Sequence, residues 1–93
     1  MSVDVLFLGT GDAFGSGGRL QTAALVTGSG ARVLVDCGSA TLPALRARGI
    51  DTGSIDAIFL THLHGDHFGG VPFFLMDAHY GSTRSAPLTI AGP

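Results

Sequence analysis

The ten residues Thr61–Gly70, which read THLHGDHFGG, place three imidazoles and one carboxylate within six consecutive positions. The nearly continuously apolar stretch Ile55–Thr61 leads directly into them. An exposed loop has no reason to concentrate four such side chains, and zinc prefers imidazole nitrogen and carboxylate oxygen as ligands. The sequence therefore predicts a metal site.

The spacing of these residues favours two ions over one. His62 and His64 are two positions apart, so in an extended segment they project to one side and can bind a single ion. Asp66 and His67 follow Gly65, where the chain is free to turn back, so we expect them to face a second ion. The predicted metal ligands are His62, His64, Asp66 and His67.

Other residue types with metal or redox chemistry are sparse. Cys37 is the single cysteine, so neither a C-x-x-C pair nor a C-x-x-C-H haem motif is present. A small packed thiol is the expected role for Cys37, and a surface position is expected for His79.

Three segments together resemble one protein family. Thr61–Gly70 is similar to the H-x-H-x-D-H signature of the metallo-beta-lactamase fold superfamily. With Val71–Leu75 behind it, the segment most resembles the ribonuclease Z (tRNA 3'-processing endonuclease) branch and its phosphodiesterase relatives. Leu8–Phe14 and Leu34–Gly38 fit the same branch. The resemblance thus covers nearly the whole chain.

The resemblance implies an α+β protein with an αββα sandwich, of which residues 1–93 look like the N-terminal part of a single domain. We expect a mixed, mainly antiparallel sheet with two flanking helices. Composition agrees, because a 93-residue chain with 45% hydrophobic and 13% charged residues has more apolar surface than a short domain hides. In the family, one further histidine for each metal and a bridging aspartate come later in the chain. The 93 residues alone are therefore expected to lack part of the active site.

The resemblance also implies a reaction and roles for individual residues. Two zinc ions would share a hydroxide that attacks a phosphodiester, with Asp66 as ligand and catalytic residue. Asp36 and Thr61 would form hydrogen bonds with the metal ligands and fix their orientation without binding the metal. Phosphate contacts dominate nucleic-acid affinity, and the best candidate for one is Arg19, although the chain has five arginines, no lysine and a net charge of −2.

Several alternatives stay open. The substrate could be an aryl sulfate, a lactone or a small phosphodiester instead of RNA. Two hypotheses come from other functional classes. One is a mononuclear iron oxidoreductase of the same fold, and the other is a non-catalytic metal-binding scaffold. The sequence has no apolar stretch of about 20 residues and no signal-like start, so we expect a cytoplasmic protein without a membrane partner, and a homodimer is plausible.

Local patterns predict five strands and two helices. The expected strands are 3–8, 23–27, 32–36, 55–61 and 88–90, and the expected helices are 40–48 and 72–80. A glycine-rich loop is expected over 9–18 and a hairpin turn over 28–31. Ser39 is expected to cap the first helix and Gly49 to end it. The strand 55–61 is expected to be buried on both faces.

Overall fold

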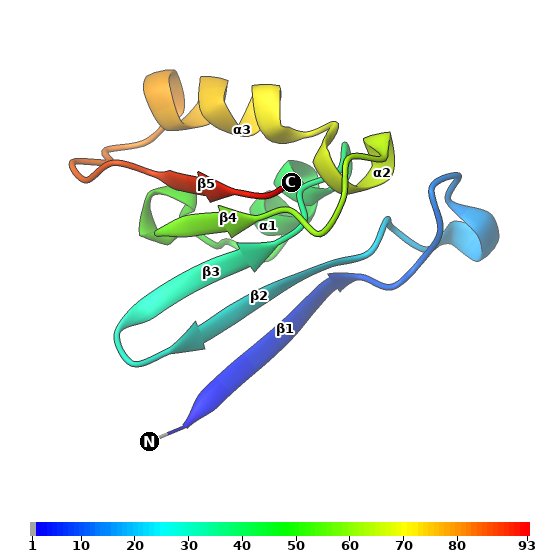
Figure 1. Cartoon of the computed structure of the whole chain (residues 1–93), viewed down its shortest axis with the longest axis horizontal. Helices are drawn as coiled ribbons and strands as arrows, with labels where there is room; N and C mark the ends of the chain where they lie inside the picture. Colours follow the sequence, from blue (N-terminus) through cyan, green and yellow to red (C-terminus); the bar gives the residue numbers. More distant parts are fainter. Residues whose placement is uncertain (1) are drawn as a thin grey trace.

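A computed structural model describes residues 2–93, which form one five-stranded sheet with helices on one face (Figure 1). The strands are β1 (Val3–Gly9), β2 (Ala23–Gly28), β3 (Ala31–Val35), β4 (Ala57–Phe59) and β5 (Thr89–Ala91). The α-helices are α1 (Thr41–Ala47), α2 (Gly65–Phe68) and α3 (Val71–Met76). Two 3-10 turns, η1 (Ser16–Gly18) and η2 (Thr52–Ser54), and one π-helical turn, η3 (Asp77–Gly81), complete the chain.

The sheet is mixed, and its spatial order follows the sequence order from β1 to β5. β1, β2 and β3 pair antiparallel, whereas β4 and β5 join in parallel. β1, β3 and β4 therefore run in the same direction, and their carboxyl ends meet at one edge of the sheet. The predicted mixed sheet is confirmed.

The hairpin between β2 and β3 turns over two residues. Ser29 has a φ of 52° and Gly30 a φ of 76°, so both central residues are left-handed. A two-residue turn of this kind matches the twist of the flanking strands, which explains the predicted hairpin.

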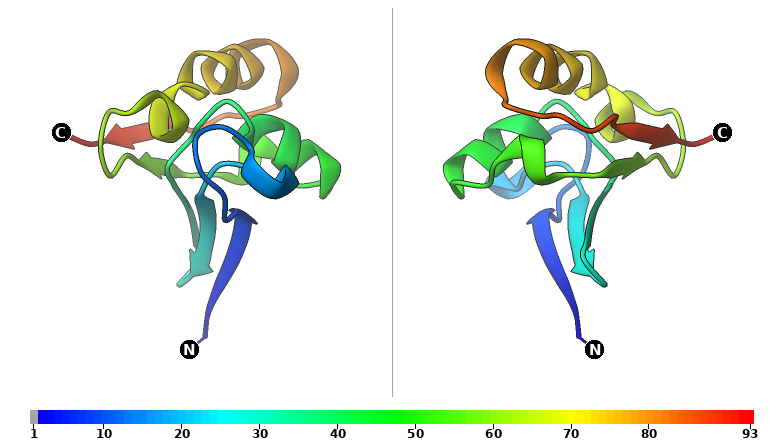
Figure 2. Two further views of the ribbon diagram at one scale, coloured as in Figure 1. Left: turned by 90° about the vertical axis from the view of Figure 1, so that its right-hand side faces the viewer. Right: turned by 90° about the vertical axis from the view of Figure 1, so that its left-hand side faces the viewer.

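The core lies between the sheet and helices α1 and α3. Leu25, Leu34 and Ile58 are register partners across three strands and are at most 2% exposed. Leu45 of α1 and Phe74 of α3 close over them and are fully buried. Each such side chain contributes about 1.5–3 kcal/mol of hydrophobic stabilisation. Figure 2 shows both helices on the same side of the twisted sheet.

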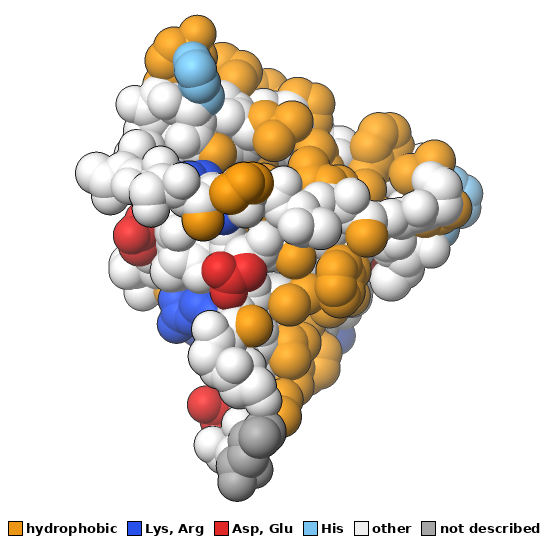
Figure 3. Space-filling view, turned by 60° about the vertical axis from the view of Figure 1, so that its left-hand side comes forward, with side chains coloured by type: hydrophobic (Ala, Val, Ile, Leu, Met, Phe, Trp, Pro, Cys, Tyr) orange, Lys and Arg blue, Asp and Glu red, His pale blue; other side chains and the backbone are white. Residues whose placement is uncertain are grey.

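The opposite face of the sheet is apolar and open. Val3, Val5 and Phe7 alternate along β1 and are 53–61% exposed, and Phe59 on β4 is 47% exposed. Figure 3 shows hydrophobic side chains gathered in a band on this side of the molecule. A second layer covers this face in a two-sheet sandwich, which agrees with the excess of apolar residues in the sequence.

The expected strand 55–61 differs from the structure in length and burial. β4 has three residues, and Phe59 is half-exposed although Ile55 and Ile58 are fully buried. The prediction of burial on both faces is wrong because helices cover one face only. The last strand also begins one residue later than expected, since Leu88 packs against the core.

The first helix begins differently from the prediction. Ala40 occupies the cap position of α1, and no side chain caps the helix. Ser39 instead donates its hydroxyl to Gln21 Oε1 at 3.1 Å. Gly49, with a φ of 67°, follows the helix end as predicted.

The second predicted helix is divided in the structure. Pro72 lies in the first turn of α3 as predicted, but the α-helix ends at Met76 and continues as η3. At the point where the helix changes, the Asp77 carboxylate accepts hydrogen bonds from Arg46 and Thr52. The short helix α2 was not predicted. Among residues 2–93, no helix is long and apolar enough to cross a membrane.

Candidate metal centre

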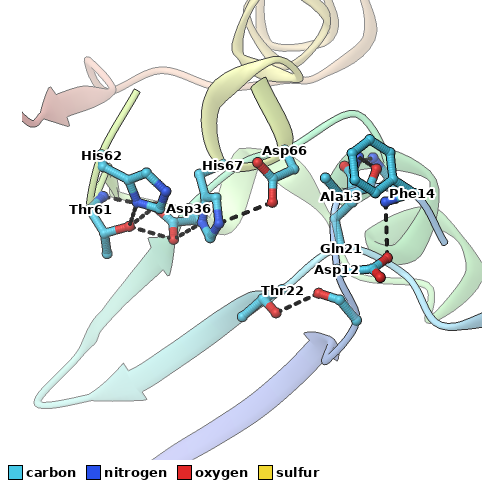
Figure 4. A network of polar contacts seen from close by, with 12 residues as sticks. Asp12, Ala13, Phe14, Gln21, Thr22, Asp36, Thr61, His62, Asp66 and His67 are labelled. Carbon is cyan, nitrogen blue, oxygen red and sulfur yellow. Dashed lines mark hydrogen bonds and ion pairs between the residues drawn. The ribbon is translucent and has the colours of Figure 1, made fainter. Parts of the chain in front are cut away.

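The candidate residues lie in three loops at one edge of the sheet, the last of which includes the short helix α2. The loops follow the carboxyl ends of β1, β3 and β4, which the topology brings to the same edge. They carry, in order, Asp12 with Arg19, then Asp36, and then the run from His62 to His67. Figure 4 shows the side chains of Asp36, His62, Asp66 and His67 together.

The histidine run changes from extended chain to helix in its middle. His64 has extended backbone angles (φ −74°, ψ 145°) and is followed by α2. The helical turn brings His67 back beside His62, with ring centroids 4.0 Å apart. The His62 and His64 rings meet edge to face at 4.7 Å. The three imidazoles thus form one cluster.

Hydrogen bonds orient two of these rings. His67 Nδ1 lies 2.7 Å from Asp36 Oδ2, and the carboxylate can only accept, so this nitrogen carries the proton. Thr61 donates its hydroxyl to Asp36, so at 2.9 Å it accepts from His62 Nδ1. In both rings Nε2 is therefore the nitrogen left to bind a metal when the ring is neutral.

Asp66 and His67 have the spacing of two ligands on one ion. His67 Nε2 lies 3.2 Å from Asp66 Oδ2. Two ligands bound at 2.0–2.1 Å in a tetrahedral site are about 3.3 Å apart. With Nδ1 protonated, Nε2 of a neutral ring would turn a lone pair toward the carboxylate, so a contact this short requires a cation between the two atoms. A metal ion or a second proton meets this requirement.

A larger ligand set does not converge in the part of the chain that the structure describes. No group of three or more His, Cys, Asp or Glu side chains there is arranged to hold a metal ion. The chemistry of the donor set and the spacing of the Asp66–His67 pair fit zinc, but two ligands do not complete a site.

Asp36 connects the ligand run to the end of β3. It is 4% exposed, has a φ of 65°, and accepts a further hydrogen bond from the Thr61 amide at 2.8 Å. Burial alone raises the pKa of a carboxyl, but the hydrogen bonds from Thr61 and His67 outweigh it and keep the pKa of Asp36 below its ordinary value. Asp36 is therefore ionised and fixed in orientation.

Backbone contacts, which sequence reasoning missed, hold α2 against the β3–α1 loop. The Cys37 amide donates to His67 O at 2.7 Å, and the Gly70 amide donates to Cys37 O at 2.9 Å. A Cβ atom on Gly38 would collide with the Asp66 carbonyl, and one on Gly70 with the Gly38 carbonyl. The only sequence signal for this contact is a glycine in each of the two motifs.

Cys37 is a packed thiol. It is fully buried, and burial together with the nearby Asp36 charge raises its pKa to about 12. A metal ligand would need the thiolate, so the structure supports the predicted packing role.

The glycine-rich loop after β1 is organised by Asp12. Its carboxylate accepts hydrogen bonds from the Phe14 and Ser16 amides at 3.0 and 3.1 Å. Hydrogen bonds from Ser16 and Phe14 lower the pKa of Asp12. Arg19 is exposed on the same loop, and its contact with phosphate stays a prediction.

Comparisons with known proteins place this site in context. The family model described as "Anti-Pycsar protein Apyc1" matches residues 3–93. Ribonuclease Z of Clostridium beijerinckii is 40% identical over 91 residues, which cover 98% of this chain and 29% of the relative. Zinc phosphodiesterase ELAC protein 1 of Homo sapiens is 44% identical over 96 residues, which cover 100% of this chain and 26% of the relative.

Solved structures agree with the predicted fold. Human tRNase Z, short form, superimposes with a TM-score of 0.86 at 40% identity, covering 99% of this chain and 35% of that chain. The metallo-beta-lactamase fold protein YhfI from Bacillus subtilis gives a TM-score of 0.84 at 25% identity. The match covers 99% of this chain and 37% of that chain. This chain thus spans less than a third of the length of these curated relatives. It matches the fold of the two solved structures over nearly all of its own length.

Proposed function

Since this chain belongs to the Apyc1 family and has the N-terminal half of the metallo-beta-lactamase fold, we propose that it forms part of a zinc-dependent phosphodiesterase. The proposed substrate is an RNA-type phosphodiester, as the names ribonuclease Z and zinc phosphodiesterase among its relatives suggest. Cytoplasmic location and homodimer formation stay predictions.

The observation that carries the proposal is the contact between His67 Nε2 and Asp66 Oδ2 at 3.2 Å. Asp36 accepts a hydrogen bond from the opposite ring nitrogen, so Nε2 is the nitrogen that faces the Asp66 carboxylate. This arrangement supports an assignment of both residues as ligands of one ion. His62 and His64 are the proposed ligands of the other.

When bound, such ions would supply Lewis-acid chemistry that neutralises negative charge on the phosphoryl oxygens and activates water for attack. The proposed role of the residues of this chain is to hold the metal ligands in place and to orient them. Asp36 and Thr61 set the tautomers of His67 and His62, and the backbone contacts of Cys37 fix the position of α2. The proposed catalytic role of Asp66 is to orient the attacking hydroxide in addition to binding the metal.

The test measures metal content and hydrolysis of bis(p-nitrophenyl) phosphate for the wild type, Asp66→Ala and Asp4→Ala. Asp4 is an exposed carboxylate on β1 and serves as the control. We expect zinc in the wild type and in Asp4→Ala, and a loss of about a hundredfold or more in turnover for Asp66→Ala, the size typical of a positioned catalytic side chain. Iron in place of zinc would favour the oxidoreductase alternative. Bound zinc without turnover would favour a metal-binding scaffold.

A further inference from the structure

Phe14 is the most exposed large hydrophobic side chain of the described residues, at 91%. It lies in the glycine-rich loop between β1 and β2. Both faces of the phenyl ring are therefore open to solvent and free to contact a ligand.

The loop around Phe14 is fixed although the ring is free. The Phe14 amide donates to Asp12 Oδ1 at 3.0 Å, and the carbonyl of Ala13 accepts from Gln21 Nε2 at 3.1 Å. Gly11 closes the base of the loop, donating to Leu20 O at 2.7 Å. A ring on such a backbone loses little entropy when it binds a flat partner.

Gln21 also ties this loop to the candidate metal centre. Its Oε1 accepts from Ser39 Oγ at 3.1 Å and from the Ala40 amide at 3.4 Å. Gly38, next to Ser39, lies in backbone contact with Asp66. Phe14 therefore has a set position relative to Asp66, and Figure 4 shows both residues at the same edge of the sheet.

The second most exposed aromatic side chain of the described residues lies elsewhere. Tyr80 is 82% exposed, belongs to the π-helical turn η3 and packs edge to face against His79 at 4.4 Å. Phe14 differs because it shares its loop with the exposed cation Arg19 and lies at the edge with the histidines. A loop that carries both an aromatic face and a cation suits an unpaired nucleotide, whose base stacks while its phosphate meets the charge.

We propose that Phe14 is a base-stacking residue that takes the nucleobase of the substrate while its phosphodiester lies at the histidine cluster. The substrate class is then an unpaired nucleotide unit and not a simple alkyl or aryl phosphodiester. This inference rests on the proposed phosphodiesterase function.

The first experiment compares two esters with the same leaving group, thymidine 5'-(p-nitrophenyl phosphate) and methyl p-nitrophenyl phosphate. Stacking on an aromatic side chain is worth about 1–3 kcal/mol, so Phe14→Ala should raise KM for the nucleoside ester about tenfold. Its KM for the methyl ester should not change. Phe14→Trp should restore the nucleoside KM, and Tyr80→Ala, the matched control, should leave both values unchanged.

The second experiment does not depend on turnover. The metal-free protein is titrated with uridine monophosphate and, separately, with ribose 5-phosphate, which lacks the base, and the ring protons of Phe14 are followed by NMR. Stacking predicts an upfield ring-current shift with the nucleotide only. Equal shifts with both ligands would overturn the inference.

The two proposals fail in different ways. If the wild type binds zinc but hydrolyses neither ester, the phosphodiesterase proposal fails, and the NMR titration alone decides the role of Phe14. If both esters are hydrolysed and Phe14→Ala changes their KM values equally, the stacking role fails and the phosphodiesterase proposal stands.

Discussion

The Asp36 carboxylate lies 2.7 Å from His67 Nδ1, and this contact joins the end of β3 to the metal-ligand run 31 residues later. Asp36 adopts a left-handed backbone conformation to make it, with a φ of 65°. Aspartate and asparagine tolerate this region better than most residues.

Replacing Asp36 should therefore weaken metal binding without breaking the fold. Asp36→Asn keeps the shape and the tolerance of left-handed angles but removes the charge that holds the His67 proton. Loss of such a supporting partner typically costs 10–100-fold in metal affinity, and we expect a drop of this size in a zinc titration against a competing chelator. Asp4→Asn is the control and should bind zinc as the wild type does.

Gly70 is predicted to tolerate no side chain. A Cβ atom there would collide with the carbonyl of Gly38, so Gly70→Ala should lower the free energy of unfolding by about 1–3 kcal/mol, as overpacking does. Gly65→Ala is the matched control, since a Cβ at Gly65 meets nothing within 4 Å. Urea denaturation measures both, and equal stability of the two variants would contradict the close backbone contact.

Asp77 is predicted to anchor the π-helical turn. Its side chain is 7% exposed and accepts hydrogen bonds from Arg46 and Thr52. Asp77→Ala should lower the free energy of unfolding by about 2 kcal/mol, mostly because the buried Thr52 hydroxyl loses its partner. The Arg46 contact adds little, since Arg46 is largely exposed. Asp4→Ala should be neutral in the same denaturation experiment.

Cys37 should be unreactive in the folded protein. It is fully buried and its pKa is raised to about 12, so little thiolate is present at neutral pH. Ellman's reagent should therefore modify it only as the protein unfolds, with full reaction of one thiol in urea. Rapid modification under native conditions would contradict this packing.

Asp12 should control the order of the glycine-rich loop at low pH. Its folded-state pKa is lowered from 3.8, so its contribution is fully present above pH 3.8 and is lost as the pH falls through the lowered value. The Phe14 and Ser16 amide resonances should shift in that acidic range, followed by NMR. In Asp12→Asn these titrations should disappear.

The sequence alone was sufficient where the signal is local. The run from His62 to His67 predicted the kind of ligands, because chemistry depends on residue type and spacing. The hairpin at Ser29 and Gly30 and the helix stop at Gly49 followed from turn preferences that involve only neighbouring residues. These features required no knowledge of distant contacts.

Only the tertiary structure decided how the segments meet. The short length of β4 and the exposure of Phe59 depend on which face the helices cover. Ser39 bonds to Gln21 and not to its own helix, and His67 takes its orientation from Asp36. Such partners are 18 and 31 residues apart in the chain, and no local pattern encodes their contact. Sheet topology brings the carboxyl ends of β1, β3 and β4 together, and this common edge turns separate motifs into one site.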